Sequence, residues 1–152
     1  MVTYIQLLHV RIMRNIEAII KDIEEYAPVN DEWESLDELI DEACHANDRR
    51  VVKPLLGLLE RNQDHDGYGV FWSIVHGLEG LGGYETELAT SVLSKPHEMS
   101  VLMLNRMLNG GIQAIDGRPV LEILNEIATN NAFSNSVRED AKRFVAYQQE
   151  NM

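Results

Sequence analysis

The sequence predicts an all-α protein made of about eight short antiparallel helices. Apolar residues recur at steps of three and four along most of the chain, a spacing that places them on one face of a helix. Strict alternation of apolar and polar residues is hard to find, so no strand is expected. The chain has 152 residues, of which 45% are hydrophobic. We therefore expect a single all-helical domain over residues 1–152.

The first three expected helices lie in the N-terminal part of the chain. The first one ends near Pro28, because the residue before a proline is biased away from helix. A second helix begins after Asn30–Glu32, and a third follows Asn47–Asp48 and accepts Pro54 in its first turn. The three apolar stripes are Ile5, Leu8, Ile12, Ile16, Ile19, Ile23 and Tyr26; Trp33, Leu36, Leu39, Ile40 and Ala43; and Val51, Val52, Leu55, Leu58 and Leu59.

Five further helices are expected after the polar turn 62–69. Gly80 and Gly110 follow two of the stripes and suit helix C-termini, whereas Asp116–Gly117 is typical of a turn. The stripes are Val70, Phe71, Ile74, Val75 and Leu78; Leu88, Ala89, Val92 and Leu93; Val101, Leu104, Met107 and Leu108; Val120, Ile123, Leu124 and Ile127; and Val137, Ala141, Phe144 and Val145. Residues Tyr147 to Met152 are expected to fray.

A weak internal repeat predicts how these helices are arranged. At a constant offset of 34 residues, Val52, Leu55 and Leu59 correspond to Thr86, Ala89 and Leu93, and then to Val120, Ile123 and Ile127. At an offset of 30, Phe71, Ile74, Leu78 and Gly80 correspond to Val101, Leu104, Leu108 and Gly110. Two alternating classes of helix indicate a stack of helical pairs of the HEAT or armadillo type. A compact helical bundle is the alternative.

The charge is strongly acidic and unevenly distributed. The chain has 25 Asp plus Glu against 13 Lys plus Arg, a formal net charge of −12. Contact with phosphate needs a basic surface, so direct nucleic-acid binding is not expected. Eleven of the acids fall between Glu17 and Glu42, where Lys21 is the only basic residue. Like charges at helical spacing repel, and a basic partner would relieve this repulsion. The alternative is a solvated face that aids solubility.

The candidate partner-binding residues come from this acidic segment and from aromatic residues in or near it. The carboxylates would supply charge, and Trp33 or Tyr68 would supply an aromatic anchor. The candidates are Glu24, Glu25, Asp31, Glu32, Trp33, Glu34, Asp37, Glu38, Asp41, Glu42 and Tyr68.

The sequence indicates no catalytic residue and no bound metal or cofactor. The one cysteine, Cys44, lies beside acidic residues that raise a thiol pKa. Residues 62–67 begin like a calcium loop, but Ser73 stands where the bidentate glutamate is needed. Asp64 and Asp66 are therefore expected to act as turn and N-cap residues. The five histidines match no zinc pattern.

No membrane segment or secretory signal is expected. The apolar residues near the N-terminus are interrupted by Gln6, His9, Arg11 and Arg14, well short of a spanning length. The sequence therefore predicts a cytoplasmic protein with no contact to a membrane.

The central segment Phe71–Glu79 is more distinctive than the rest of the chain. Its spacing turns Phe71 inward and puts Trp72 and His76 on the adjacent face. We expect Trp72 to pack between helices, and Arg106 to pair with Glu79 inside the stack.

Segments in roughly the middle third of the chain resemble small all-helical immunity proteins, which guard bacteria against polymorphic toxins, including those of contact-dependent growth inhibition. They are Phe71–Glu79 (FWSIVHGLE), Tyr84, Pro96–Met99 (PHEM) and Leu104–Asn109 (LNRMLN). Met99 departs from the family pattern, in which we expect tryptophan after Pro-x-Glu.

The resemblance implies a protein that is not an enzyme. It implies binding, in the cytoplasm, to the C-terminal toxin domain of the same system and occlusion of that domain's active site or substrate groove. Such toxins are often RNases or DNases, whose basic surface an acidic inhibitor can occupy with electrostatic steering.

Two other functions remain open at this point. One is a generic helical-repeat scaffold that binds a peptide or a partner helix in its groove. The other is a small enzyme or metal-binding protein, based on Asp64–Asp66 and the scattered histidines.

Overall fold

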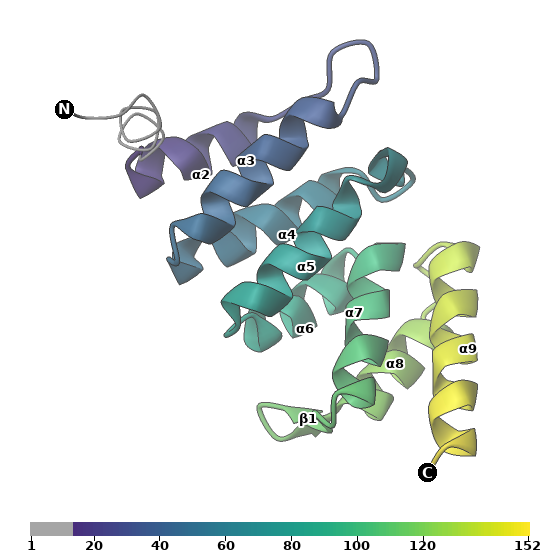
Figure 1. Cartoon of the computed structure of the whole chain (residues 1–152). Coiled ribbons are helices and arrows are strands. Elements are labelled where there is room, and N and C mark those ends of the chain that lie inside the picture. The colour runs from purple at the N-terminus through teal and green to yellow at the C-terminus, as the bar shows by residue number, and fades with distance from the viewer. Residues whose placement is uncertain (1–13) are drawn as a thin grey trace, which may run out of the picture.

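The computed structural model describes residues 14–152, which form eight α-helices and one small hairpin (Figure 1). The helices are α2 (Ile16–Glu25), α3 (Glu34–His45), α4 (Val52–Arg61), α5 (Phe71–Leu81), α6 (Glu85–Ser94), α7 (Glu98–Asn109), α8 (Val120–Thr129) and α9 (Asn135–Glu150). Single 3-10 turns at Arg49–Val51 and Gly67–Gly69 precede α4 and α5. The predicted all-α class is confirmed.

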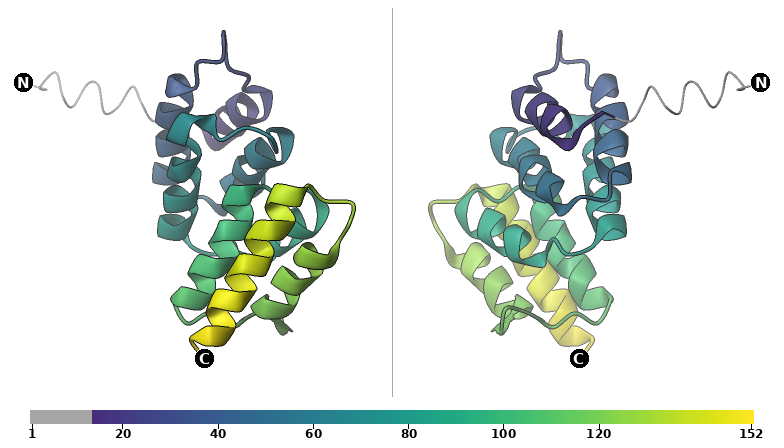
Figure 2. Two further views of the ribbon diagram at one scale, coloured as in Figure 1. Left: turned by 90° about the vertical axis from the view of Figure 1, so that its right-hand side faces the viewer. Right: turned by 90° about the vertical axis from the view of Figure 1, so that its left-hand side faces the viewer.

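The helices are arranged in two rows of four. In one row α2, α4, α6 and α8 each pack on the next, and in the other row α3, α5, α7 and α9 do the same (Figure 1). Each helix of the first row also packs on the helix that follows it in sequence, and the side views show the rows as two layers (Figure 2). This arrangement is the stack of helical pairs that the repeat predicts, rather than the alternative bundle.

The repeat itself is confirmed in one row and corrected in the other. Phe71, Ile74 and Leu78 of α5 and their partners 30 residues later in α7 are all buried. The register expected for α6 is wrong by one residue: Leu88 and Val92 face the core, whereas Thr86 is exposed. Because Ala89 and Leu93 are also apolar and lie next to the core residues, the pattern fits either register. The equivalent core pairs are Leu55 and Leu59, Leu88 and Val92, and Ile123 and Ile127.

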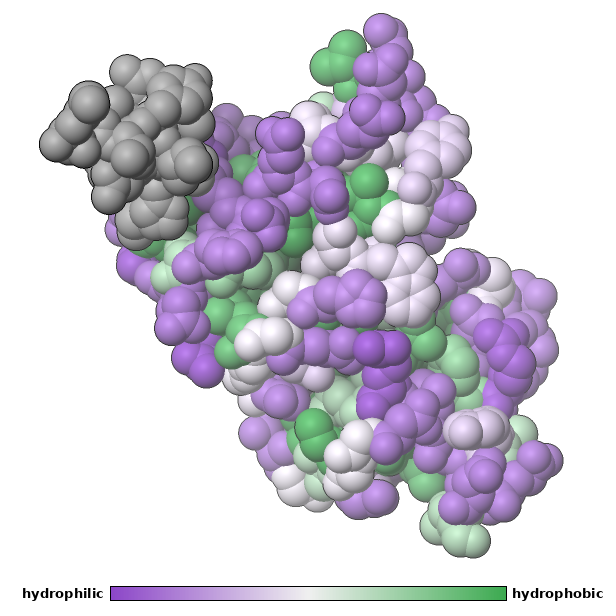
Figure 3. Space-filling model, viewed as in Figure 1, coloured by the Kyte–Doolittle hydropathy of each residue, from purple (hydrophilic) through white to green (hydrophobic). Residues whose placement is uncertain are grey.

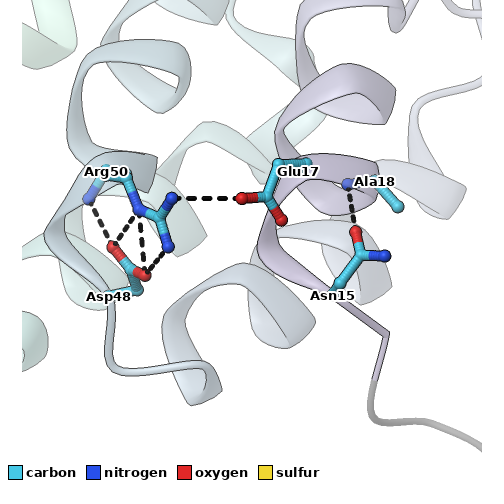
Figure 4. A network of polar contacts seen from close by, with 5 residues as sticks. All are labelled: Asn15, Glu17, Ala18, Asp48 and Arg50. Atoms are coloured by element: carbon cyan, nitrogen blue, oxygen red, sulfur yellow. Dashed lines mark hydrogen bonds and ion pairs between the residues drawn. The ribbon is translucent and has the colours of Figure 1, made fainter.

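Within the described residues, the helix expected from Ile5 to Tyr26 corresponds to α2 alone. Helix α2 begins at Ile16, and Asn15 is its N-cap, with extended backbone angles of φ −70° and ψ 155°. The Asn15 side chain accepts a hydrogen bond from the backbone N–H of Ala18 at 2.8 Å (Figure 4). The earlier part of the expected stripe, Ile5 to Ile12, lies outside the described residues.

Two details near the C-terminus also differ from expectation. Tyr147 to Glu150, expected to fray, belong to α9. Gln148 Nε2 donates to the side-chain oxygens of Asn105 and Asn109 on α7, both at 2.8 Å, and thereby ties the last turn down. The turn expected at Asp116–Gly117 is confirmed, but it joins two unpredicted strands, β1 (Ala114–Ile115) and β2 (Arg118–Pro119). Asp116 and Gly117 have φ values of 50° and 81°, as a two-residue hairpin turn requires.

One continuous hydrophobic core runs between the two rows of helices. It includes residues from all eight helices, from Ile19 on α2 to Val145 on α9. Over residues 14–152, no helix combines the length and the apolar character that crossing a membrane would require.

Candidate functional site

Helix α3 has one buried apolar face and one exposed acidic face. Leu36, Ile40 and Ala43 are buried at spacings of four and three. Asp37, Glu38 and Asp41 therefore point away from the core and are exposed. The apolar stripe that the sequence predicts for this helix is thus buried at Leu36, Ile40 and Ala43, and these three acidic residues lie outside it.

A cavity of about 580 Å³ lies between α3 and α5, and we call it the acidic groove. Asp37, Glu38 and Asp41 form its α3 side, and Ser73 and His76 contribute from α5. Its remaining lining residues are Ile40, Cys44, His45, Asn47, Gly77, Gly80 and Leu81. The view that has α3 and α5 in front is mainly hydrophilic, with apolar patches between polar side chains (Figure 3).

Two glycines of α5 shape this groove. A Cβ at Gly77 would lie 2.5 Å from Cys44 Sγ, so the backbone of α5 approaches α3 closely at this point. A Cβ at Gly80 would meet nothing within 4 Å, so the groove is open there. Gly77 and Gly80 are separated by nearly one helical turn, and together they leave this part of the α5 side of the groove without protruding side chains.

The thiol in the groove is not a nucleophile. Burial raises the pKa of Cys44 to about 11, and the negative charge of Asp41 adds to the shift. Because the thiolate is the reactive form, Cys44 is unreactive near neutral pH. This confirms the expected direction of the shift and adds burial as its larger cause.

Several of the acidic residues already have partners within the chain. The Ser73 hydroxyl donates to Asp37 Oδ1, and His45 Nδ1 lies 3.3 Å from Asp41 Oδ1. Glu42 is only half-exposed, and its Oε1 lies 2.6 Å from Nη2 of Arg14. Glu38 is exposed and makes no ion pair with any residue in 14–152. The groove therefore has one carboxylate that is hydrogen-bonded within the chain, that of Asp37, an exposed one near His45, that of Asp41, and one without an ion-pair partner among the described residues, that of Glu38.

Two arginines from outside the acidic segment reduce its net charge. Arg14 Nη1 lies 2.5 Å from Asp22 Oδ2, in addition to its contact with Glu42. Arg50 pairs with Glu17 at 3.2 Å and with Asp48 at 2.7 Å (Figure 4). The sequence segment alone shows Lys21 as its single base, because these two arginines are adjacent to the segment in space but lie outside it along the chain.

Asp31 is held by a cluster of hydrogen bonds rather than presented to a partner. Its Oδ2 accepts from the Tyr68 hydroxyl at 2.6 Å, and its Oδ1 accepts from Trp33 Nε1 and His65 Nε2, both at 2.9 Å. The hydrogen bond from Tyr68, followed by that from Trp33, lowers the pKa of Asp31. Asp31 therefore joins the loop before α3 to the loop before α5.

The structure corrects the choice of aromatic anchor. Trp33 is only 3% exposed and packs edge-on against Phe71, with ring centroids 5.2 Å apart, so it belongs to the core. Its spacing of three residues from Leu36 and seven from Ile40, which puts all three on one helix face, was the signal for burial. Tyr68 is 70% exposed, although its hydroxyl is engaged with Asp31.

Trp72, expected to pack between helices, is 40% exposed instead. Its ring stacks on His76, with centroids 5.5 Å apart and planes inclined by 24°. The guanidinium of Arg106 lies 5.8 Å from the Trp72 ring centroid. Because the core spacing assigns Phe71 to the buried face, the adjacent position 72 points outward, and this signal could have identified Trp72.

The predicted pair between Glu79 and Arg106 is confirmed. Arg106 Nε donates to Glu79 Oε2 at 2.9 Å, and Nη2 donates to Oε1 at 2.8 Å. This bidentate contact joins α5 to α7 and raises the pKa of Arg106, mainly through the hydrogen bonds that Arg106 donates to Glu79. It also holds the guanidinium beside Trp72.

The remaining candidates lie apart from the groove lining. Glu24 and Glu25 are exposed at the end of α2, in the other row of helices. Glu32 belongs to the exposed loop between α2 and α3, and Glu34 begins α3. Of the candidate residues, the structure brings Asp37, Glu38 and Asp41 into one cavity.

The segment that begins like a calcium loop has a structural role. The Asp66 side chain accepts from Tyr68 N–H at 2.8 Å and caps the 3-10 turn, as predicted for an N-cap residue. Asp64, His65, Asp66 and Glu98 line a second cavity of about 420 Å³. Within residues 14–152, no group of three or more His, Cys, Asp or Glu side chains is placed to hold a metal ion.

Comparisons with protein-family models, with characterised proteins and with solved structures find no significant match to this chain.

Proposed function

We propose that this protein is an immunity protein, which binds a basic toxin domain of its own system and occludes that domain's active site or substrate groove. The observation that carries the proposal is the acidic groove, in which Asp37, Glu38 and Asp41 line one exposed cavity of a helical stack. The protein would act in the cytoplasm as a stoichiometric inhibitor, without catalysis and without a cofactor.

The electrostatics favour a basic partner. Carboxylates gathered on α3 repel one another at helical spacing, and a basic surface would relieve this repulsion. The net charge of −12 would also steer such a partner into contact. A nuclease fits this description because it must present a basic surface to phosphate.

The first test uses the protein encoded immediately upstream of this gene, where the proposal expects the toxin. We would express the C-terminal domain of the upstream neighbour and titrate it with this protein by calorimetry at two salt concentrations. The proposal expects one-to-one binding with a Kd in the nanomolar range, as tight inhibitory complexes show, and rescue of growth in cells that express the toxin domain. A neighbour that is not toxic, or a toxic domain that does not bind, contradicts the proposal.

The role of the groove is tested by reversing its charges. The triple variant Asp37→Lys, Glu38→Lys, Asp41→Lys should lower the association rate at low salt and remove most of its salt dependence, because steering follows the charge facing the partner. Its fold is checked by circular dichroism.

The matched control carries three reversals on other helices. Glu87→Lys, Glu122→Lys and Glu150→Lys change the net charge by the same amount at exposed positions of α6, α8 and α9. If both triple variants slow association equally, the groove has no special role and the net charge alone accounts for steering.

The second candidate function is a generic scaffold. The two-row stack of helices favours it, because such stacks commonly bind peptides or partner helices along one row. It predicts modest affinity for several partners and no rescue of growth, so the same experiments separate the two functions.

A further inference from the structure

We infer that Trp72 and the acidic groove form one docking surface, and that its occupant is a single α-helix of the partner that presents a row of Arg or Lys side chains. This inference rests on the proposed function and specifies the part of the partner that is bound. It also replaces Trp33 with Trp72 as the aromatic anchor.

Trp72 is held in a fixed position before any partner arrives. His76 stacks against its ring, and the Arg106 guanidinium lies beside the same ring, fixed in turn by two hydrogen bonds to Glu79. A large aromatic side chain that is 40% exposed yet restrained has little conformational entropy to lose on binding. These are the properties of an interface hot spot.

His76 connects this anchor to the groove. It stacks on Trp72 and also lines the cavity, and it lies one turn further along α5. Gly80 lies another turn along and leaves open space at its Cβ position. Along the exposed face of α5, the protruding rings of Trp72 and His76 are thus followed by Gly80, which has no side chain and lies beside the carboxylates of α3.

The shape of the groove fits a helix. It is bounded by two helices, so a third helix can lie along it with its side chains between theirs. The α3 side of the lining extends from Asp37 to His45, about 12 Å at the rise of 1.5 Å per residue. That length accommodates about two turns of a partner helix.

The spacing of charges fits the same occupant. Asp37 and Asp41 are separated by four residues, close to one turn or about 6 Å along α3. Basic residues at i, i+4 on a partner helix have the same separation. The Asp37 carboxylate is held by its hydrogen bond from Ser73, and the Asp41 carboxylate is 74% exposed and accessible to a basic side chain.

A second copy of this chain is a poor occupant of the surface. It would bring further carboxylates to a groove that already contains three, in a protein of net charge −12. Charge complementarity therefore favours a basic partner over self-association.

The test uses two synthetic probes and the full chain. The first probe is an alanine-based helical peptide with one arginine per turn on a single face, and the second has the same composition with its arginines spread around the helix. The protein is labelled with 5-fluorotryptophan, so that Trp33 and Trp72 give separate fluorine NMR signals, which the variant Trp72→Phe assigns. Both peptides are titrated at low ionic strength.

The inference expects the single-face peptide to bind more tightly and to shift the Trp72 signal while leaving the Trp33 signal in place. The neutralised variant Asp37→Asn, Glu38→Gln, Asp41→Asn should weaken binding about tenfold, and Trp72→Ala should weaken it by a similar factor. The control variant Glu87→Gln, Glu122→Gln, Glu150→Gln should bind within about twofold of the unmodified protein, because its lost charges lie on other helices.

Three results would overturn the inference. These are equal binding of the two peptides, an unmoved Trp72 signal, or equal weakening by the groove and control variants. Its failure is distinguishable from failure of the proposed function. Neutralisation of the toxin that survives both Trp72→Ala and the groove variant rejects the docking surface alone. Selective binding of the single-face peptide without rescue of growth rejects the immunity role alone.

Discussion

Gly77 on α5 faces the thiol of Cys44 on α3 so closely that a methyl group at position 77 would lie 2.5 Å from Sγ. The contact sets the distance between two neighbouring helices of one row, and it forms part of the lining of the acidic groove. A side chain at this position would have to move either the thiol or the helix.

We expect Gly77→Ala to be less stable than Gly80→Ala by about 1–3 kcal/mol, the usual cost of overpacking. Both changes gain up to about 1 kcal/mol of helix propensity, so Gly80 serves as the matched control, having nothing within 4 Å of its Cβ position. Urea unfolding measures both. Adding Cys44→Ala to Gly77→Ala should close the gap; if it does not, the thiol is not what fills the space.

The ion pair between Glu79 and Arg106 should contribute measurably to the packing of α5 on α7. Its side chains are 26% and 36% exposed and meet through two hydrogen bonds, so a double-mutant cycle with Glu79→Gln and Arg106→Gln should give a coupling of about 0.5–1 kcal/mol. The more exposed pair Glu139–Lys142 on α9 is the comparison and should give a smaller coupling. Equal couplings for the two pairs would contradict this prediction.

His97 should make the protein less stable as the pH falls below about 6.5. The side chain is 2% exposed, and burial lowers its pKa, although the hydrogen bond to the His65 carbonyl opposes the shift. Because the folded state holds fewer protons, this contribution is complete above the ordinary pKa of 6.5 and is lost as the pH falls through the folded value. Urea unfolding at several pH values between 8 and 5 measures the slope, which cannot exceed about 1.4 kcal/mol per pH unit for one proton.

The matched variant is His97→Asn. Asparagine is also a good N-cap and can accept the hydrogen bond that His97 Nδ1 now accepts from Met99 N–H. The variant should flatten the slope between pH 6.5 and 5. An unchanged slope assigns the pH dependence to another group.

Removing the Tyr68 hydroxyl should raise the pKa of Asp31. The hydrogen bond from Tyr68 is the largest cause of the lowered pKa, so Tyr68→Phe should move the carboxyl carbon titration of Asp31 towards its ordinary value in an NMR experiment. The stability that Asp31 supplies is present above its ordinary pKa of 3.8 and is lost as the pH falls through the folded value. Acid unfolding should therefore begin at a higher pH in the variant. Coincident titration curves for the two proteins would show that the hydroxyl does not act on Asp31.

The helices were predictable because their core spacing is local. Phe71, Ile74 and Leu78 identify α5 from the sequence. The capping residues locate the ends of most other helices to within a few residues. The start of α2 at Ile16 was missed because the apolar spacing continues unchanged across Asn15, whereas the capping hydrogen bond that Asn15 accepts from Ala18 depends on one side chain. The register of α6 was missed because two adjacent apolar pairs satisfy the same periodicity.

The candidate site was predictable only in part, because its geometry depends on residues distant in sequence. The acidic face of α3 follows from spacing, but the groove needs Gly77 and Gly80 on α5. The partial neutralisation of Glu42 needs Arg14, which lies 28 residues earlier. Trp33 is buried because it shares a helix face with Leu36, whereas Trp72 is exposed because its neighbour Phe71 takes the buried position. Amino-acid composition carries no information about either outcome.

The arrangement in rows also determines how the destabilisation of one part of the molecule affects the stability of the rest. Each helical pair contacts chiefly its immediate neighbours, so the free energy of unfolding approximates a sum of intrinsic and nearest-neighbour contributions, as in a one-dimensional chain. The pair α2–α3, which together with its connecting loop contains 11 of the 25 acidic residues, has a neighbouring pair on only one side within residues 14–152, and so has the pair α8–α9 at the other end of the stack. The amides of both pairs should therefore exchange with solvent through local opening, while those of α4 to α7 remain protected until the whole stack unfolds.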